Sequence, residues 1–246
     1  EQKNVINMIH HERGKEFILP KKVASIEAEK EAISLSRKTA TTLYEKMNLH
    51  QQKNNFEKLG TLEIRGTLLQ EQSGVSGHFK LVANKLDWHL TQDLGMFGSL
   101  ETNSYADGGI NKRLRHEYQL SSYLSQQAKR EHPFNFFYWD ELYETVVLND
   151  SVDVQDNLVV TLDSADLSSV TATINESSAQ VEQISMQFID PVWGTYPRKL
   201  SYTEYQPYCG VNIPMMFTID DHEVGNTIFK ILEITSDNCD DMSLTP

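Results

Sequence analysis

The eight histidines are the first residues in this sequence that could do chemistry, as metal ligands. The stretch HHERGKE, residues 10–16, begins like the helix of a zinc metalloprotease. Four positions after His11 stands Lys15 instead of the second histidine that such a zinc site needs. Apart from the adjacent pair His10 and His11, the histidines are scattered and have no partner at ligand spacing. The sequence therefore predicts neither a metal nor another cofactor.

Ser76 is the serine whose surroundings come nearest to those of a hydrolase nucleophile. It lies in GVSGH, residues 74–78, with glycines close on both sides. The spacing differs from that of a nucleophile elbow, and the alternating apolar residues around it favour a hairpin turn. No glycine-rich loop that could cradle a phosphate follows a predicted strand. We expect no catalytic residue, and hence a protein that is not an enzyme.

The two cysteines are predicted to form a disulfide bond. The stretch DDHEVGN, residues 220–226, has the composition of a turn between two strands. If this turn is centred near Glu223, antiparallel pairing places Cys209 opposite a position next to Cys239, within the distance that a disulfide allows. The alternative is two unrelated free thiols. A Cys209–Cys239 bond would indicate an oxidising compartment, either the periplasm or the outside of a cell.

Composition and charge exclude several classes of partner. The chain has 246 residues, of which 39% are hydrophobic and 23% are charged, as in a globular protein with a sizeable core. The formal charge of -13 disfavours binding to nucleic acid, which needs clustered lysine and arginine. No apolar run reaches the roughly 18 residues of a membrane-spanning helix. The first residues have no signal-peptide pattern, which fits a cytosolic protein and a secreted or periplasmic protein whose leader has been removed equally well.

The first 52 residues are expected to form an N-terminal helical segment. Between Ala24 and Asn48, apolar residues recur at spacings of seven, seven, three and four, with charged residues between them. This pattern is typical of one long amphipathic helix. The apolar positions are Ile26, Ile33, Ala40, Leu43 and Met47.

From residue 53 to residue 246 the pattern changes to alternation, which indicates one domain of about ten strands. Leu62, Ile64 and Leu68, for example, alternate with polar residues. A helical insertion near residues 119–146 interrupts the strands and contains the aromatic cluster HPFNFFYW, which favours burial. An antiparallel sheet of this size twists and curls, and its concave face needs a cover. We therefore predict an α+β fold, in which amphipathic helices cover a large curled antiparallel sheet that forms an unclosed barrel.

Several motifs carry a family resemblance. They are LGTLEIRG at the start of the sheet, SGVSGHFKL in the next hairpin, REHPFNFFYWDELYETVVL at the end of the insertion, and YTEYQPYCGVNIPMMFTI with IFKILEITSDNCDD near the C-terminus. Over roughly residues 55–246 the chain resembles the LolA-like superfamily of periplasmic lipoprotein carriers and related lipoproteins. The resemblance implies a half-barrel wrapped around helices. In the carriers, the apolar concavity of this half-barrel takes up acyl chains.

Two apolar strand faces are candidates for a ligand-binding wall. Ile184, Met186 and Phe188 share one face of their strand, and Met215 and Phe217 share one face of another. Methionine suits a lipid-facing wall because its side chain is flexible and polarizable. An ordinary core would use the same residues.

The stretch DPVWGTYP, residues 190–197, is predicted to be a loop that carries Trp193 and Tyr196. These aromatic residues could line the mouth of a pocket, meet a partner or pack within a turn. Two hypotheses follow for the whole protein. The first is a non-enzymatic periplasmic or cell-envelope protein that binds a lipid or another apolar ligand in the concave face. The alternative is an accessory or protein-interaction module with a closed core, associated with a hydrolase or peptidase.

Overall fold

The computed structural model describes residues 49–104, 110–113, 116–119, 122–152, 157–164, 167–190, 194–221 and 225–243. All of them belong to one compact unit, residues 39–246. The predicted helix between Ala24 and Asn48 lies outside the described residues, and so does Trp193. The expected boundary between residues 52 and 53 falls inside a described helix, α3 (Leu49–Lys58).

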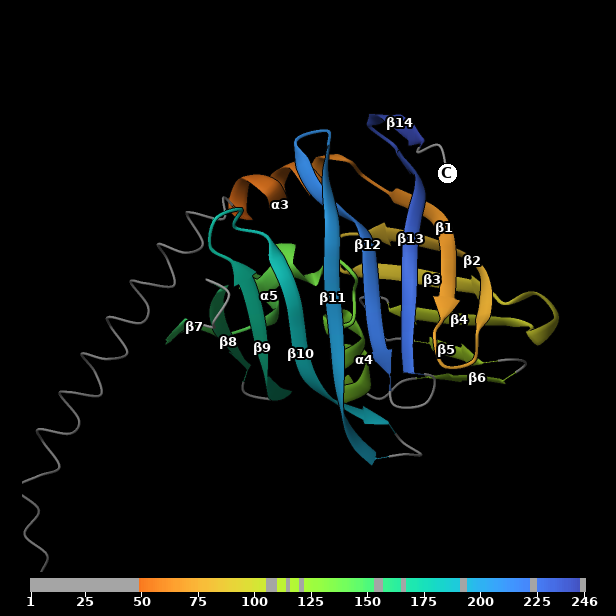
Figure 1. Ribbon diagram of the computed structural model, residues 1–246, viewed down its shortest axis with the longest axis horizontal. Helices are drawn as coiled ribbons and strands as arrows, with labels where there is room; N and C mark the ends of the chain where they lie inside the picture. Colours follow the sequence, from red (N-terminus) through yellow and green to blue (C-terminus); the bar gives the residue numbers. More distant parts are fainter. Residues whose placement is uncertain are drawn as a thin grey trace, which may run out of the picture. The chain divides into compact units, whose positions relative to one another are not determined.

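One antiparallel sheet of fourteen strands organises the described residues (Figure 1). Thirteen strands follow one another in the order β6-β5-β4-β3-β2-β1-β13-β12-β11-β10-β9-β8-β7, and β14 pairs with β13. The strands are β1 (Leu62–Gln70), β2 (Val75–Asn84), β3 (Asp87–Asp93), β4 (Ser99–Ser104), β5 (Ile110–Arg113), β6 (His116–Gln119), β7 (Thr145–Val152), β8 (Asn157–Ser164), β9 (Leu167–Asn175), β10 (Val181–Asp190), β11 (Gly194–Tyr208), β12 (Val211–Asp221), β13 (Gly225–Ser236) and β14 (Cys239–Ser243).

The described helices besides α3 are short. They are α4 (Ser122–Arg130), α5 (Trp139–Leu142) and two 3-10 turns, η2 (Gly95–Phe97) and η3 (Asn135–Tyr138). Figure 1 shows α4 and α5 behind strands β9 to β12. No helix in the described ranges has the length and apolarity needed to cross a bilayer.

The sheet is not closed, because its two end strands, β6 and β7, do not pair with each other in the described residues. These end strands are consecutive along the chain apart from the insertion, which runs through α4, η3 and α5. The chain thus passes from one end of the sheet to the other through helices rather than through strand pairing. The predicted α+β fold with a curled, unclosed antiparallel sheet is confirmed. The observed number of strands exceeds the expected ten, in part because the single strand expected around residues 110–118 is two strands, β5 and β6, of four residues each.

Alternating burial defines which face of the sheet is the core. In β1, Leu62, Ile64 and Leu68 are buried, as the sequence predicts. The register of β1 against β13 shifts between Arg65 and Gly66. A side chain at Gly66 would overlap the Lys230 carbonyl oxygen and the ring of Phe79. Glycine therefore permits the close strand approach at this irregularity.

Candidate functional site

Side chains from β10, β11 and β12 form the central part of the apolar concave face. Ile184 and Met186 on β10 are buried, and so are Met215 and Phe217 on β12. All four belong to one hydrophobic cluster. The structure thus brings these predicted residues together on the inner side of the sheet.

Phe188 and Tyr196 mark one end of this face. They pair directly across β10 and β11, and their ring centroids lie 5.2 Å apart. The Arg198 guanidinium lies 4.8 Å from the Phe188 ring centroid and forms an ion pair of 2.8 Å with Glu131, which follows α4. Tyr196 is buried and belongs to strand β11 instead of the predicted loop. The reason is that β11 begins at Gly194, so strand pairing includes the second half of DPVWGTYP.

The aromatic part of the insertion packs against the concave face. Its five aromatic side chains from Phe134 to Trp139 are at most 3% exposed. The Phe136 ring lies 5.3 Å from the ring of Tyr202 on β11. The cluster HPFNFFYW indicated burial, but sequence reasoning did not assign it to the candidate site. The periodicity of apolar residues in the sequence does not indicate which face of a sheet such a cluster will cover.

Helix α4 bridges two distant parts of the sheet. On one side, Trp88 of β3 donates a hydrogen bond from Nε1 to the Ala128 carbonyl at 3.0 Å. On the other side, Gln127 exchanges two hydrogen bonds with the backbone of Ile189 in β10, at 3.2 and 3.1 Å. A few side-chain hydrogen bonds therefore hold α4 across the open side of the sheet.

Helix α3 contacts the insertion through the ring of Phe56 and the ammonium group of Lys53. Phe56 packs on Phe137 with ring centroids 4.8 Å apart. Lys53 Nζ forms ion pairs of 2.9 Å with Asp140 and 2.5 Å with Glu141 on α5. Partial burial opposes the charge of Lys53, but hydrogen bonds to Glu141 and Asp140 outweigh this cost and raise its pKa. These contacts tie α3 to α5.

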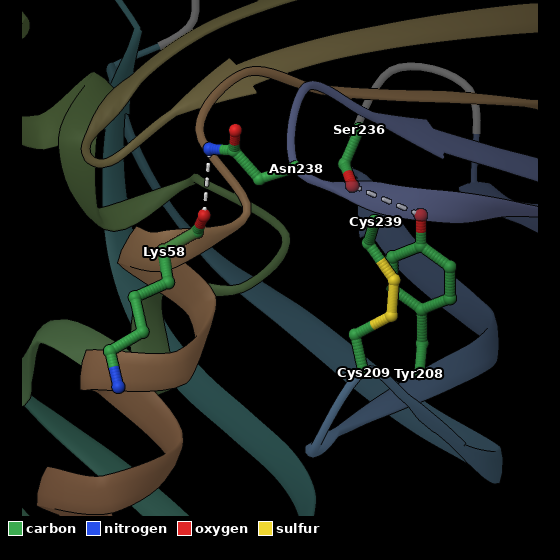
Figure 2. Close-up of a disulfide and its surroundings, with 6 residues drawn as sticks. All are labelled: Lys58, Tyr208, Cys209, Ser236, Asn238 and Cys239. Atoms are coloured by element: carbon green, nitrogen blue, oxygen red, sulfur yellow. Dashed lines mark hydrogen bonds between the residues drawn. A yellow bond between two sulfur atoms is a disulfide. The ribbon is translucent and has the colours of Figure 1, made fainter.

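The predicted disulfide between Cys209 and Cys239 is present, with Cα atoms 6.5 Å apart (Figure 2). It joins the β11–β12 turn to the start of β14. The register differs from the expected one by one position, since Phe217 pairs with Phe229, and Cys209 lies in the turn with φ 47°. A shift of one position still leaves the two cysteines close enough for the bond.

Both turns hold the C-terminal part of α3. Asn238 donates a hydrogen bond from Nδ2 to the Lys58 carbonyl at 2.9 Å (Figure 2). Asn55 donates from Nδ2 to the Gly210 carbonyl at 3.0 Å. The disulfide therefore links two turns that each form a hydrogen bond with the C-terminal part of α3.

The unclosed sheet with helices on one face is also found in solved structures. A LolA superfamily protein from Nitrosomonas europaea aligns with a TM-score of 0.53 and 11% identity, over 82% of this chain and 94% of that one. The chain has a LolA-like fold. A DUF1329 family protein from Desulfovibrio piger aligns with a TM-score of 0.51 and 11% identity, over 82% of this chain and 93% of that one. No family model and no curated protein sequence matches the chain.

The polar groups inside the LolA-like half-barrel are dispersed among aromatic rings. His132 is completely buried, and its Nδ1 accepts a hydrogen bond from the Phe134 N–H at 2.8 Å. Burial lowers the pKa of His132 to about 3, so the ring is neutral. In the part of the chain that the structure describes, no three His, Cys, Asp or Glu residues are grouped as a metal site requires. The inner face of the sheet is therefore apolar and is covered by the aromatic side chains of the insertion.

Proposed function

We propose that this LolA-like half-barrel is a non-enzymatic protein of the periplasm or cell envelope that binds a lipid or another apolar ligand on its concave face. The observation that carries the proposal is the nature of the cover. The concave face is apolar from β10 to β12, yet short helices and an aromatic insertion cover it instead of a second sheet. Such a cover can move without breaking any strand pairing. The Cys209–Cys239 bond supports an oxidising compartment.

Binding requires the insertion to move, because its side chains occupy the concave face in this structure. Phe136 and Phe137 would be displaced by an incoming chain, and their own apolar surface would need new contacts. The ion pairs of Lys53 and the hydrogen bonds of Gln127 would open or shift. These are surface or partly buried polar contacts, which water can replace at small cost.

Native mass spectrometry of gently purified protein, followed by organic extraction, tests the proposal directly. A stoichiometric lipid is the expected result. Titration of two variants with an apolar fluorophore then locates the binding site. The variants change two adjacent methionines of β12 that point to opposite faces of the sheet, Met215 to the inner face and Met216 to the outer face. Met215→Gln should weaken fluorophore binding about tenfold, while Met216→Gln should leave it unchanged. Equal binding by both variants, with circular dichroism showing intact folding, would contradict the concave site.

The accessory module is the second candidate, and a groove on the opposite face of the sheet favours it. This groove has a volume of about 650 Å³, and its lining includes Leu69, Met216 and Ile228. Leu69 is 42% exposed, which is high for a leucine within a strand. Under this candidate the protein carries no lipid, and Leu69→Ser weakens association with a purified partner hydrolase or peptidase while Met215→Gln does not.

A further inference from the structure

Three tyrosines meet inside the half-barrel where the insertion returns to the sheet. Tyr143 directly follows α5, and Tyr202 and Tyr205 belong to β11. Tyr143 and Tyr202 belong to one hydrophobic cluster, and Tyr205 packs against it. The Phe136 ring lies 5.3 Å from the Tyr202 ring and 6.5 Å from the Tyr205 ring. The three side chains thus form one cluster at the apolar face.

The backbone of β11 is irregular between two of these tyrosines, Tyr202 and Tyr205. Thr203 pairs with Met216 and Tyr205 pairs with Pro214, so the register against β12 is the same on both sides of Glu204. Glu204 has φ 57°, which lies in the left-handed region. Tyr205, which follows this irregular residue, packs against the hydrophobic cluster, and its ring lies near that of Phe136.

The hydroxyl groups of this cluster differ in their hydrogen bonding. Tyr205 donates from Oη to the Val181 carbonyl at 2.7 Å. The hydroxyls of Tyr143 and Tyr202 have no hydrogen-bond partner in the described protein, although these residues are only 5% and 2% exposed. A buried hydroxyl without a partner destabilises a protein, so most such groups are paired. Two unpartnered donors in one cluster therefore point to an acceptor from outside the chain.

A positive charge lies beside the cluster. The Arg130 guanidinium lies 4.7 Å from the ring centroid of Tyr143, and its NH1 donates to the Ser168 carbonyl at 2.9 Å. Burial raises the pKa of Tyr143 to about 12 and that of Tyr202 well above its usual value, so both hydroxyls stay protonated. The cluster thus offers hydroxyl donors next to a cation.

We propose that the hydroxyls of Tyr143 and Tyr202, beside Arg130, bind the oxygen atoms of an acyl ligand whose hydrocarbon chain lies on the apolar concave face. The inference rests on the proposed function and adds to it a polar subsite for the oxygen atoms of the ligand. A pure hydrocarbon has no acceptor for these hydroxyls, whereas a carboxylate or an ester has one. Because Arg130 is positively charged, a free fatty acid should bind more tightly than its ester.

The test compares three probes that share one chain, namely palmitic acid, methyl palmitate and hexadecane, each displacing an apolar fluorophore from the whole protein. The double variant Tyr143→Phe/Tyr202→Phe removes only the two hydroxyls. Its affinity for palmitic acid should fall roughly a hundredfold, since two hydrogen bonds to a charged group are lost. Its affinity for hexadecane should not change, and its melting temperature without ligand should not fall.

Tyr208→Phe is the matched control. Tyr208 is also buried, but its hydroxyl already shares a hydrogen bond of 3.1 Å with Ser236 near the disulfide. This variant should lose thermal stability and keep the affinities for all three probes.

The outcomes separate this inference from the proposed function. Unchanged palmitic acid affinity in the double variant, with all probes still bound, would overturn the polar subsite and leave apolar binding intact. Failure of every probe to displace the fluorophore from the wild-type protein would overturn both. An equal loss for palmitic acid and methyl palmitate would support the subsite and show that the two hydroxyls bind the carbonyl oxygen that both probes share.

Discussion

His132 shows at the residue scale how burial sets a pH response. Its folded-state pKa is about 3, below its ordinary value of 6.5, because the buried ring cannot be hydrated as a cation. Between these two values the unfolded chain binds a proton that the folded chain does not bind. The free energy of unfolding therefore rises with pH through this window and falls on acidification.

We predict that His132 alone lowers the free energy of unfolding by about 2 kcal/mol between pH 7.5 and pH 5.0. His132→Asn keeps an acceptor for the Phe134 N–H and should remove this part of the pH dependence. Urea unfolding at both pH values measures it. His89→Asn serves as the control, because His89 is only half-buried on β3 and bonds to Thr91. An identical pH dependence in the wild-type protein and His132→Asn would refute this account.

At the scale of elements, the disulfide joins two turns that both hold the end of α3. Cys209 and Cys239 are 30 positions apart, and closing a loop of this length stabilises a protein by roughly 3–4 kcal/mol in the loop-entropy model. The partners around it, Asn55 to Gly210 and Asn238 to Lys58, depend on the same two turns. Loss of the bond should therefore affect α3 and β14 before it affects the rest of the sheet.

We predict that Cys209→Ser/Cys239→Ser lowers the free energy of unfolding by this amount, measured by urea titration of the oxidised wild-type protein and the variant. Hydrogen exchange should accelerate in α3 and β14 and stay slow in β10 and β11. Reductant should bring the wild-type protein to the stability of the variant and leave the variant unchanged. Uptake of two equivalents of thiol reagent by the unreduced, denatured wild-type protein would show that the bond is not formed.

For the whole molecule, the proposed function requires the helices and the aromatic insertion to leave the concave face. Lys53 connects α3 to α5 through Asp140 and Glu141, whose side chains are 36% and 49% exposed. Exposed ion pairs of this kind contribute at most about 1 kcal/mol to stability, but they must break whenever the two helices separate. Their effect should therefore be larger on the rate of ligand entry than on folding.

We predict that Lys53→Met, which keeps the aliphatic stem, speeds the uptake of an apolar fluorophore several-fold in stopped-flow measurements. The free energy of unfolding should change by less than about 1 kcal/mol. Lys80→Met is the matched control, since Lys80 pairs with Glu63 at 2.7 Å between β2 and β1, away from the helices. Equal uptake rates in both variants would argue that α3 and α5 do not separate during binding.

Alternation in the sequence was enough to predict the faces of single strands, as for Leu62, Ile64 and Leu68 in β1. It also predicted the pairing of Cys209 with Cys239, because the turn between β12 and β13 fixes the local register and an error of one position still leaves the cysteines close. The burial of HPFNFFYW followed from its aromatic content. Each of these properties depends on residues that are near one another along the chain or on side-chain chemistry alone.

Only the tertiary structure decided which distant residues meet. Strand β1 pairs with β13, so Leu62 lies opposite Ser236, and no periodic pattern specifies such a partner. That Tyr143 and Tyr202 belong to one hydrophobic cluster depends on the insertion crossing between the two ends of an unclosed sheet. The approach of the Tyr205 ring to Phe136 likewise joins residues that are far apart along the chain. The physical reason is that alternation encodes which face of a strand is apolar. Which strand lies beside it is selected by the packing of the whole sheet and its cover.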